Sequence, residues 1–170
     1  RATEDSWASG AVSGPLSGIG GLIGSNAGPI LRSITISGQT VTGGASASSV
    51  GGLVGDNKGS ITSSRSASTV LANGTVTAVG GLVGESATGS SITNSYATGS
   101  VTATGATRVG GLVGSHDAGI INGSHAHGNV SGLDDVGGLI GFSSTAAVNT
   151  SHATGAVSGR TNVGGLIGNR

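Results

Sequence analysis

Residues Val79–Gly84 read VGGLVG, and this hexapeptide decides the fold because it occurs six times along the chain with only Val and Ile exchanged. From first residue to first residue, successive copies are 31, 29, 30, 27 and 27 residues apart. A repeat of this length, with turn residues between short β-branched runs, is typical of a solenoid, in which each repeat forms one coil of a stack. The six copies are Ile19–Gly24, Val50–Gly55, Val79–Gly84, Val109–Gly114, Val136–Gly141 and Val163–Gly168.

A second shared block, of the form I-x-x-S-x-A-x-G-x-V, follows each of the first five hexapeptides. It is clearest at Ile92–Val101, Ile121–Val130 and Val148–Val157, and looser at Ile61–Val70 and Ile30–Val41. Clusters of Gly, Asn, Asp and Ser between the blocks are typical of turns. The pattern therefore predicts an all-β protein, a single β-solenoid over residues 1–170, with about six coils of 27–31 residues and three short strands per coil.

Stacked coils place equivalent residues about 4.8 Å apart, so each repeated position becomes a column along the stack. The alignment predicts three buried aliphatic columns. It also predicts a column of serines that turn their hydroxyl groups inward to bond a backbone group at a corner. The aliphatic columns are Ile30, Ile61, Ile92, Ile121 and Val148; Val41, Val70, Val101, Val130 and Val157; and Leu22, Leu53, Leu82, Leu112, Leu139 and Leu166, and the serines are Ser33, Ser64, Ser95, Ser124 and Ser151.

The hexapeptide contains an ambiguity, because Leu82 and Val83 are neighbours and would point to opposite faces of a simple strand. Either the paired glycines bulge, or one whole aliphatic column faces outward. The favoured interpretation is a strand that is covered on both sides. The alternative is a flat apolar stripe that docks a partner.

The composition excludes several classes of protein. The 170 residues include 36 Gly, one Trp, one Tyr and one Phe, and only 8% are charged, with a formal net charge of zero. Such a chain has no basic patch for nucleic acid, no cysteine for a disulfide and no apolar run long enough to span a membrane. It also has no methionine, which predicts that Arg1 is not a translation start and that the chain is a processed product or an excised piece.

The units VGGLVG and GSITNSYATGSVTATGATRVGGLVG closely resemble the GLUG repeat, over nearly the whole chain. This resemblance implies a β-solenoid in a large secreted bacterial protein, as in filamentous-haemagglutinin-like adhesins and the stalks of immunoglobulin A1 proteases. It implies a secreted or cell-surface location and, as partners, a host surface or matrix. The repeat itself carries no catalytic site.

The chain offers little for catalysis or for a cofactor, and we expect neither. His125 and His152 occupy the same repeat position, beside His127, where a transition metal could bridge them; an exposed variable column is the favoured interpretation, so we expect no metal. The acidic residues do not recur once per coil, as those of a calcium-binding solenoid would. Four sequons, at Asn73, Asn122, Asn129 and Asn149, are candidate glycosylation sites.

The two ends of the chain fit together as one repeat. Ser6–Gly14 matches Ser151–Gly159 almost residue for residue, and residues 163–170 followed by residues 1–18 would form a closing repeat of 26 residues. A contact that continues from head to tail without closing makes an open filament. We therefore expect the chain to pair with itself through a split repeat, with an assembly interface made by Ser6, Trp7, Ala8, Val12, Val163, Leu166 and Ile167.

Three functions compete. The favoured one is an extracellular structural protein, the subunit of a head-to-tail β-solenoid fibre. The second is an excised segment of a large secreted adhesin or stalk. The third is an ice-binding solenoid, which needs threonines in register on a flat face; both candidate columns, one from Leu31 to Asn149 and one from Thr40 and Thr42 to Ala156 and Ser158, lose threonine toward the C-terminus.

Overall fold

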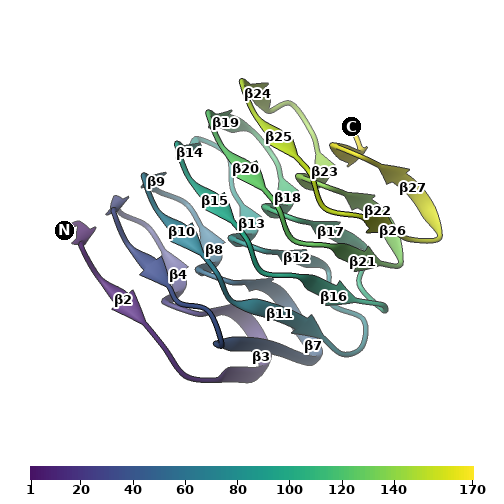
Figure 1. Ribbon diagram of the computed structural model, residues 1–170, viewed down its shortest axis with the longest axis horizontal. Coiled ribbons are helices and arrows are strands. Elements are labelled where there is room, and N and C mark those ends of the chain that lie inside the picture. The colour runs from purple at the N-terminus through teal and green to yellow at the C-terminus, as the bar shows by residue number, and fades with distance from the viewer.

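The computed structural model describes residues 1–170 as a stack of six coils built only from β-strands and turns. Figure 1 shows the coils lying one beside the next, with the N-terminus at one end of the stack and the C-terminus at the other. All strands pair in parallel with the equivalent strands of the neighbouring coils. The predicted fold class, an all-β solenoid of about six coils, is confirmed.

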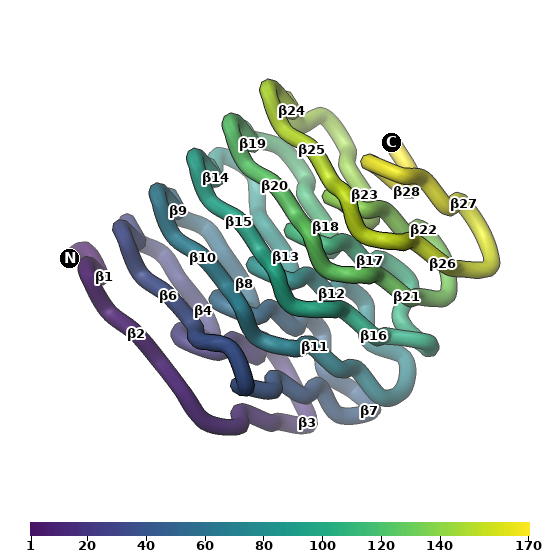
Figure 2. The backbone as a smooth tube through the Cα atoms, in the orientation of Figure 1, coloured from purple at the N-terminus to yellow at the C-terminus, as the bar shows by residue number.

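Each coil passes through four sheets in the same order, and the tube in Figure 2 follows this path from coil to coil. The first sheet has six strands, in the order β1 (Thr3–Glu4), β5 (Ile30–Leu31), β9 (Ser60–Thr62), β14 (Ser90–Thr93), β19 (Gly119–Asn122) and β24 (Ala147–Asn149). The second sheet contains β2 (Trp7–Ala8), β6 (Ile34–Thr35), β10 (Arg65–Ser66), β15 (Tyr96–Ala97), β20 (His125–Ala126) and β25 (His152–Ala153).

The third sheet has ten strands, because the long strands of the first two coils are replaced by two shorter strands in each later coil. The fourth sheet again has one strand per coil. The third sheet contains β3 (Val12–Gly20), β7 (Thr40–Gly51), β11 (Thr69–Ala72), β12 (Ala78–Gly80), β16 (Val101–Ala103), β17 (Arg108–Gly110), β21 (Val130–Gly132), β22 (Asp134–Gly137), β26 (Val157–Ser158) and β27 (Thr161–Gly164). The fourth contains β4 (Ile23–Asn26), β8 (Val54–Asn57), β13 (Val83–Ser86), β18 (Val113–His116), β23 (Ile140–Ser143) and β28 (Ile167–Asn169).

The prediction of three strands per coil was too low, because the hexapeptide does not form a strand of its own. In the third coil, β12 ends at Gly80 and β13 begins at Val83, so VGGLVG spans the corner between the third and fourth sheets. At this corner Leu82 and Val83 both point inward and are fully buried. The hexapeptide is therefore neither a strand covered on both sides nor the edge of an outward apolar stripe.

Close backbone packing explains the glycines of the hexapeptide. A Cβ atom on Gly80 would overlap the carbonyl oxygen of Val83, and one on Gly81 would overlap the carbonyl oxygen of Gly111 in the next coil. A Cβ atom on Gly84 would lie 2.6 Å from the backbone nitrogen of Val50 in the coil before. These glycines are needed because the corner brings backbone against backbone, both within a coil and between coils.

The predicted aliphatic columns form the core. Their members pair in register from coil to coil, as Ile61 does with Ile92 and Val70 with Val101. The buried side chains make two clusters that run along the stack. One holds the valines of the third sheet, and the other holds the Ile and Leu columns with the Val or Ile that follows each leucine. In the end coils the same columns are only partly covered, as at Leu22, Val148 and Val157.

Candidate assembly surfaces

The serine column lies at the corner between the first and second sheets and extends one coil further than predicted. Ser6 is its first member, and the residue before each serine has a left-handed backbone, with φ between 47° and 60°. This conformation turns the chain and aims the serine N–H along the stack. Each serine N–H donates to the serine hydroxyl of the next coil at 3.1–3.4 Å, from Ser6 through to Ser151, and each hydroxyl donates to the carbonyl oxygen two residues before it.

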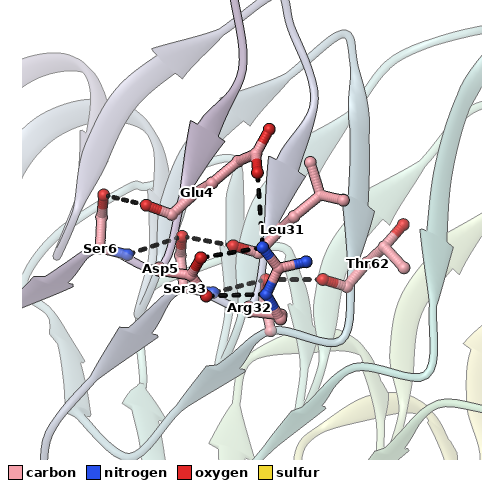
Figure 3. Close-up of polar contacts among 8 residues, drawn as sticks. Glu4, Asp5, Ser6, Leu31, Arg32, Ser33 and Thr62 are labelled. Carbon is pink, nitrogen blue, oxygen red and sulfur yellow. Dashed lines mark hydrogen bonds and ion pairs between the residues drawn. The ribbon is translucent and has the colours of Figure 1, made fainter.

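Figure 3 shows this corner in the first two coils, where an exposed ion pair joins them. The Arg32 guanidinium reaches back one coil and donates to both carboxylate oxygens of Asp5, at 2.7 and 2.8 Å, and to Glu4 at 3.4 Å. The hydrogen bond from Arg32 holds the pKa of Asp5 below its usual value. Because all three side chains are about half exposed or more, solvent screens the pair and its contribution to stability is small.

The predicted interface residues lie at opposite ends of the stack, so one chain does not bring them together. Ser6, Trp7, Ala8 and Val12 belong to the first coil, which contains β1 to β4. Val163, Leu166 and Ile167 belong to the sixth, which contains β24 to β28.

Both end coils expose apolar side chains. Only six large hydrophobic side chains in the protein are exposed, and four of them lie in these two coils. They are Trp7 (66%) and Leu16 (64%) in the first coil, and Val163 (46%) and Leu166 (39%) in the sixth. Sequence analysis missed Leu16, which lies between two register shifts in the pairing of β3 with β7.

The backbone gives the stack a direction. In the second sheet, the N–H of His125 donates to Ser95 O at 3.1 Å, and that of His152 donates to Ser124 O at 3.3 Å. Equivalent bonds link every pair of coils in this sheet, so N–H groups at these positions point to the preceding coil and carbonyl groups to the following one. At these positions the first coil therefore presents open N–H groups and the sixth coil presents open carbonyl groups, whereas at other positions, such as Leu22, the N–H points to the following coil.

Three of the four histidines form a cluster on the outer side of the second sheet. The Tyr96, His125 and His152 rings stack face to face, at centroid distances of 4.8 and 5.0 Å, and the exposed His127 ring is tilted against His125. Burial, together with the neighbouring imidazoles, lowers the pKa of His125. No three His, Asp or Glu side chains are arranged to hold a metal ion.

A second buried polar column, which sequence analysis missed, lies at the end of the fourth sheet. Its members are two residues beyond each hexapeptide, a position that is polar in every coil, and this regularity was the available signal. Asn26 donates to Asn57 at 2.8 Å, but His116 and Ser143 are fully buried and their side chains have no hydrogen-bond partner. Burial lowers the pKa of His116.

The other candidate positions lie on the surface. Asn73, Asn129 and Asn149 are exposed and Asn122 is half-buried. The two columns considered for ice binding lie in register on the first and third sheets, where Thr62 pairs with Thr93 and Thr93 with Asn122. Asp56 and Glu85 are neighbours on the fourth sheet, and burial, followed by the charge of Asp56, raises the pKa of Glu85.

These observations define the protein as a β-solenoid built from a glycine-rich repeat. Comparison with family models adds the kind of repeat: residues 73–102 match the GLUG motif. The match starts in the turn before β12 and ends in β16, so it contains one complete hexapeptide and the block that follows it. The resemblance to the GLUG repeat is thereby confirmed. No curated protein and no solved structure matches the chain.

The protein contains no helix that is long and apolar enough to span a membrane.

Proposed function

We propose that this protein is an extracellular structural protein without catalytic activity, and that its coils stack on those of a second copy to form a head-to-tail fibre. The observation that carries the proposal is the pair of open end coils. In the sixth coil, the exposed Val163 and Leu166 continue columns whose members are fully buried in the interior coils. In the first coil, Val12 and Leu22 belong to the aliphatic columns and are only partly buried. Covering this apolar surface would remove it from water, and this burial favours association by about 25 cal/mol for each Å² of apolar surface.

The pairing of interior coils specifies the joint in atomic detail. If the first coil of one copy takes the place of a seventh coil, the Trp7 N–H donates to Ser151 O and the Ser9 N–H to Ala153 O. These bonds repeat those from His152 to Ser124 O and from Thr154 to Ala126 O within the chain.

The serine column supports the same direction of growth. Ser124 N–H donates to the Ser151 hydroxyl at 3.2 Å, and the next position in the column is open. In the joint, Ser151 N–H donates to the Ser6 hydroxyl of the next copy. Donors therefore face acceptors at these positions of the joint, and the contact repeats without closing, so assembly gives an open filament.

A substitution at Ser9 tests the joint without removing an interaction inside the chain. Ser9 is exposed, and its N–H, like that of Trp7, points away from the stack, because the equivalent N–H of Thr154 points to the preceding coil. Proline at an edge strand is tolerated but removes the N–H. We expect Ser9→Pro to fold normally and to assemble far less readily than Ser9→Ala, which keeps the N–H. Sedimentation velocity over a concentration series measures assembly, and circular dichroism checks the fold. Equal assembly of the two variants would contradict the proposed joint.

The second candidate function is a segment of a large secreted adhesin or stalk, which the GLUG match supports. In that case further coils of the same chain would cover both ends. The sedimentation experiment separates the two functions. A wild-type protein that remains monomeric at every concentration would contradict the fibre and favour the segment.

A further inference from the structure

The outward column of the second sheet forms a continuous stack of rings toward the C-terminal end. The Tyr96 and His125 rings are nearly parallel, 6° apart, and His125 and His152 are 8° apart. Their strands β15, β20 and β25 pair residue for residue. Stacking therefore follows from the register, since equivalent positions of adjacent coils lie about one strand spacing apart. His152 ends this stack within the chain, and its outer ring face has no neighbouring coil.

The same column begins with the only tryptophan of the chain. Trp7 pairs with Ile34 of the second coil, and its side chain is 66% exposed. One side of Trp7 thus faces Ile34, and the other faces away from the stack. A coil added before the first would cover this second side.

We infer that Trp7 of one copy stacks on His152 of the copy before it, so that the ring column runs through the joint. This inference rests on the proposed head-to-tail assembly and names the side-chain contact that anchors it. Because coil pairing sets Trp7 over His152 in the column, the rings meet at the spacing that already brings His125 over His152. Aromatic rings in such an offset stack attract each other beyond the area that they bury. The contact pairs the most exposed large apolar side chain with an aromatic partner at the opposite end.

Intrinsic fluorescence tests the contact directly, because Trp7 is the sole indole in the protein. The experiment uses the full chain at pH 8, over a concentration series that is also followed by sedimentation. On assembly we expect the emission of Trp7 to move to shorter wavelength, as the exposed ring becomes covered.

Three variants assign the change to His152. His152→Ala should raise the concentration needed for assembly by about tenfold and weaken the emission shift. His152→Phe, which restores a ring, should recover both. Tyr96→Ala is the matched control: Tyr96 is a ring of the same column, but it stacks on His125 and lies two coils away from the sixth coil, so this variant should behave as the wild type.

The outcomes separate the inference from the function on which it rests. If the wild type assembles while the emission of Trp7 stays constant, or if His152→Ala assembles as readily as Tyr96→Ala, the ring contact is wrong and the fibre stands. If the wild type does not assemble at any concentration, both are wrong.

Discussion

Two buried polar columns run along the stack, and they differ in how completely they are bonded. The column at the first corner is serine in every coil, and each hydroxyl from Ser33 to Ser151 both accepts from one backbone N–H and donates to a backbone carbonyl. The column at the end of the fourth sheet changes from coil to coil. Asn26 and Asn57 bond each other, whereas His116 and Ser143 have no partner.

The difference shows what repetition achieves in a solenoid. Hydrogen bonds form along a column when the donor of one coil lies in register with the acceptor of the next. A column with the same residue in every coil can therefore satisfy all of its polar groups in the same way. In a column whose residue varies, the hydrogen-bond partners differ from coil to coil. A buried polar group that is left without a partner lowers the free energy of unfolding by about 1–3 kcal/mol. We therefore expect the serine column to stabilise the stack, and the region around His116 and Ser143 to be its weakest interior part.

The largest effect on stability should come from placing an unpaired charge in the interior. Neither polar column contains such a charge. Leu82 is fully buried in the Ile and Leu cluster. Leu82→Asp would bury a carboxylate without a partner, at a cost of several kcal/mol, so the variant should not fold. Circular dichroism and thermal melting would show this. A native melting temperature would mean that the leucine column does not face inward.

A pair of serine substitutions compares the two columns directly. Ser95→Ala removes the acceptor of the Ser64 N–H and leaves that buried group unpaired, which should cost about 1–3 kcal/mol. Ser143→Ala removes a buried hydroxyl that has no partner, so stability should stay within about 0.5 kcal/mol of wild type. Urea denaturation measures both variants. Equal losses would contradict the distinction between the columns.

His116 should make the stability of the stack depend on pH. Burial lowers its pKa below the ordinary value, so the folded chain holds the neutral ring and the unfolded chain binds the proton more readily. Stability is then full above the unfolded pKa, near 6.5, and falls as the pH drops toward the folded pKa. The pKa of His125 is lowered too and acts in the same direction, while the Asp117 carboxylate opposes the shift of His116.

The variant His116→Asn tests this dependence. Asn57, at the same column position, bonds the backbone of Gly59 through both amide atoms, and an asparagine at 116 could repeat this with Ala118. We expect melting curves of His116→Asn to show a smaller loss between pH 8 and pH 5 than those of the wild type. An unchanged loss would mean that His116 does not titrate on unfolding.

The fold could be predicted from the sequence largely because the repeat shows which residue types occupy the same position in six successive coils. The Ile, Val and Leu columns and the serine column were all located in this way. The corner at Gly80 and Gly81 could not be, because an alternation rule assumes a straight strand and contains no information on where the chain bends. Close approach of the two backbones, rather than side-chain preference, sets that corner.

The candidate interface was predictable only in part. Matching Ser6–Gly14 to Ser151–Gly159 identifies the residues that would meet, and the structure adds the direction in which the backbone groups point. Leu16 needed coordinates, because its position depends on local irregularities of β3. The column around His116 could be found from the polar residue two positions beyond every hexapeptide, but only coordinates show that it is buried.

The central claim is that coils stack across copies as they stack within the chain, and the axial repeat of assembled material tests it most directly. Six coils at one strand spacing each advance the stack by about 29 Å per copy. Electron microscopy of the full chain at high concentration should show thin fibres with this repeat and with strands perpendicular to the fibre axis. Isolated particles at every concentration, or fibres with an unrelated axial repeat, would contradict the claim.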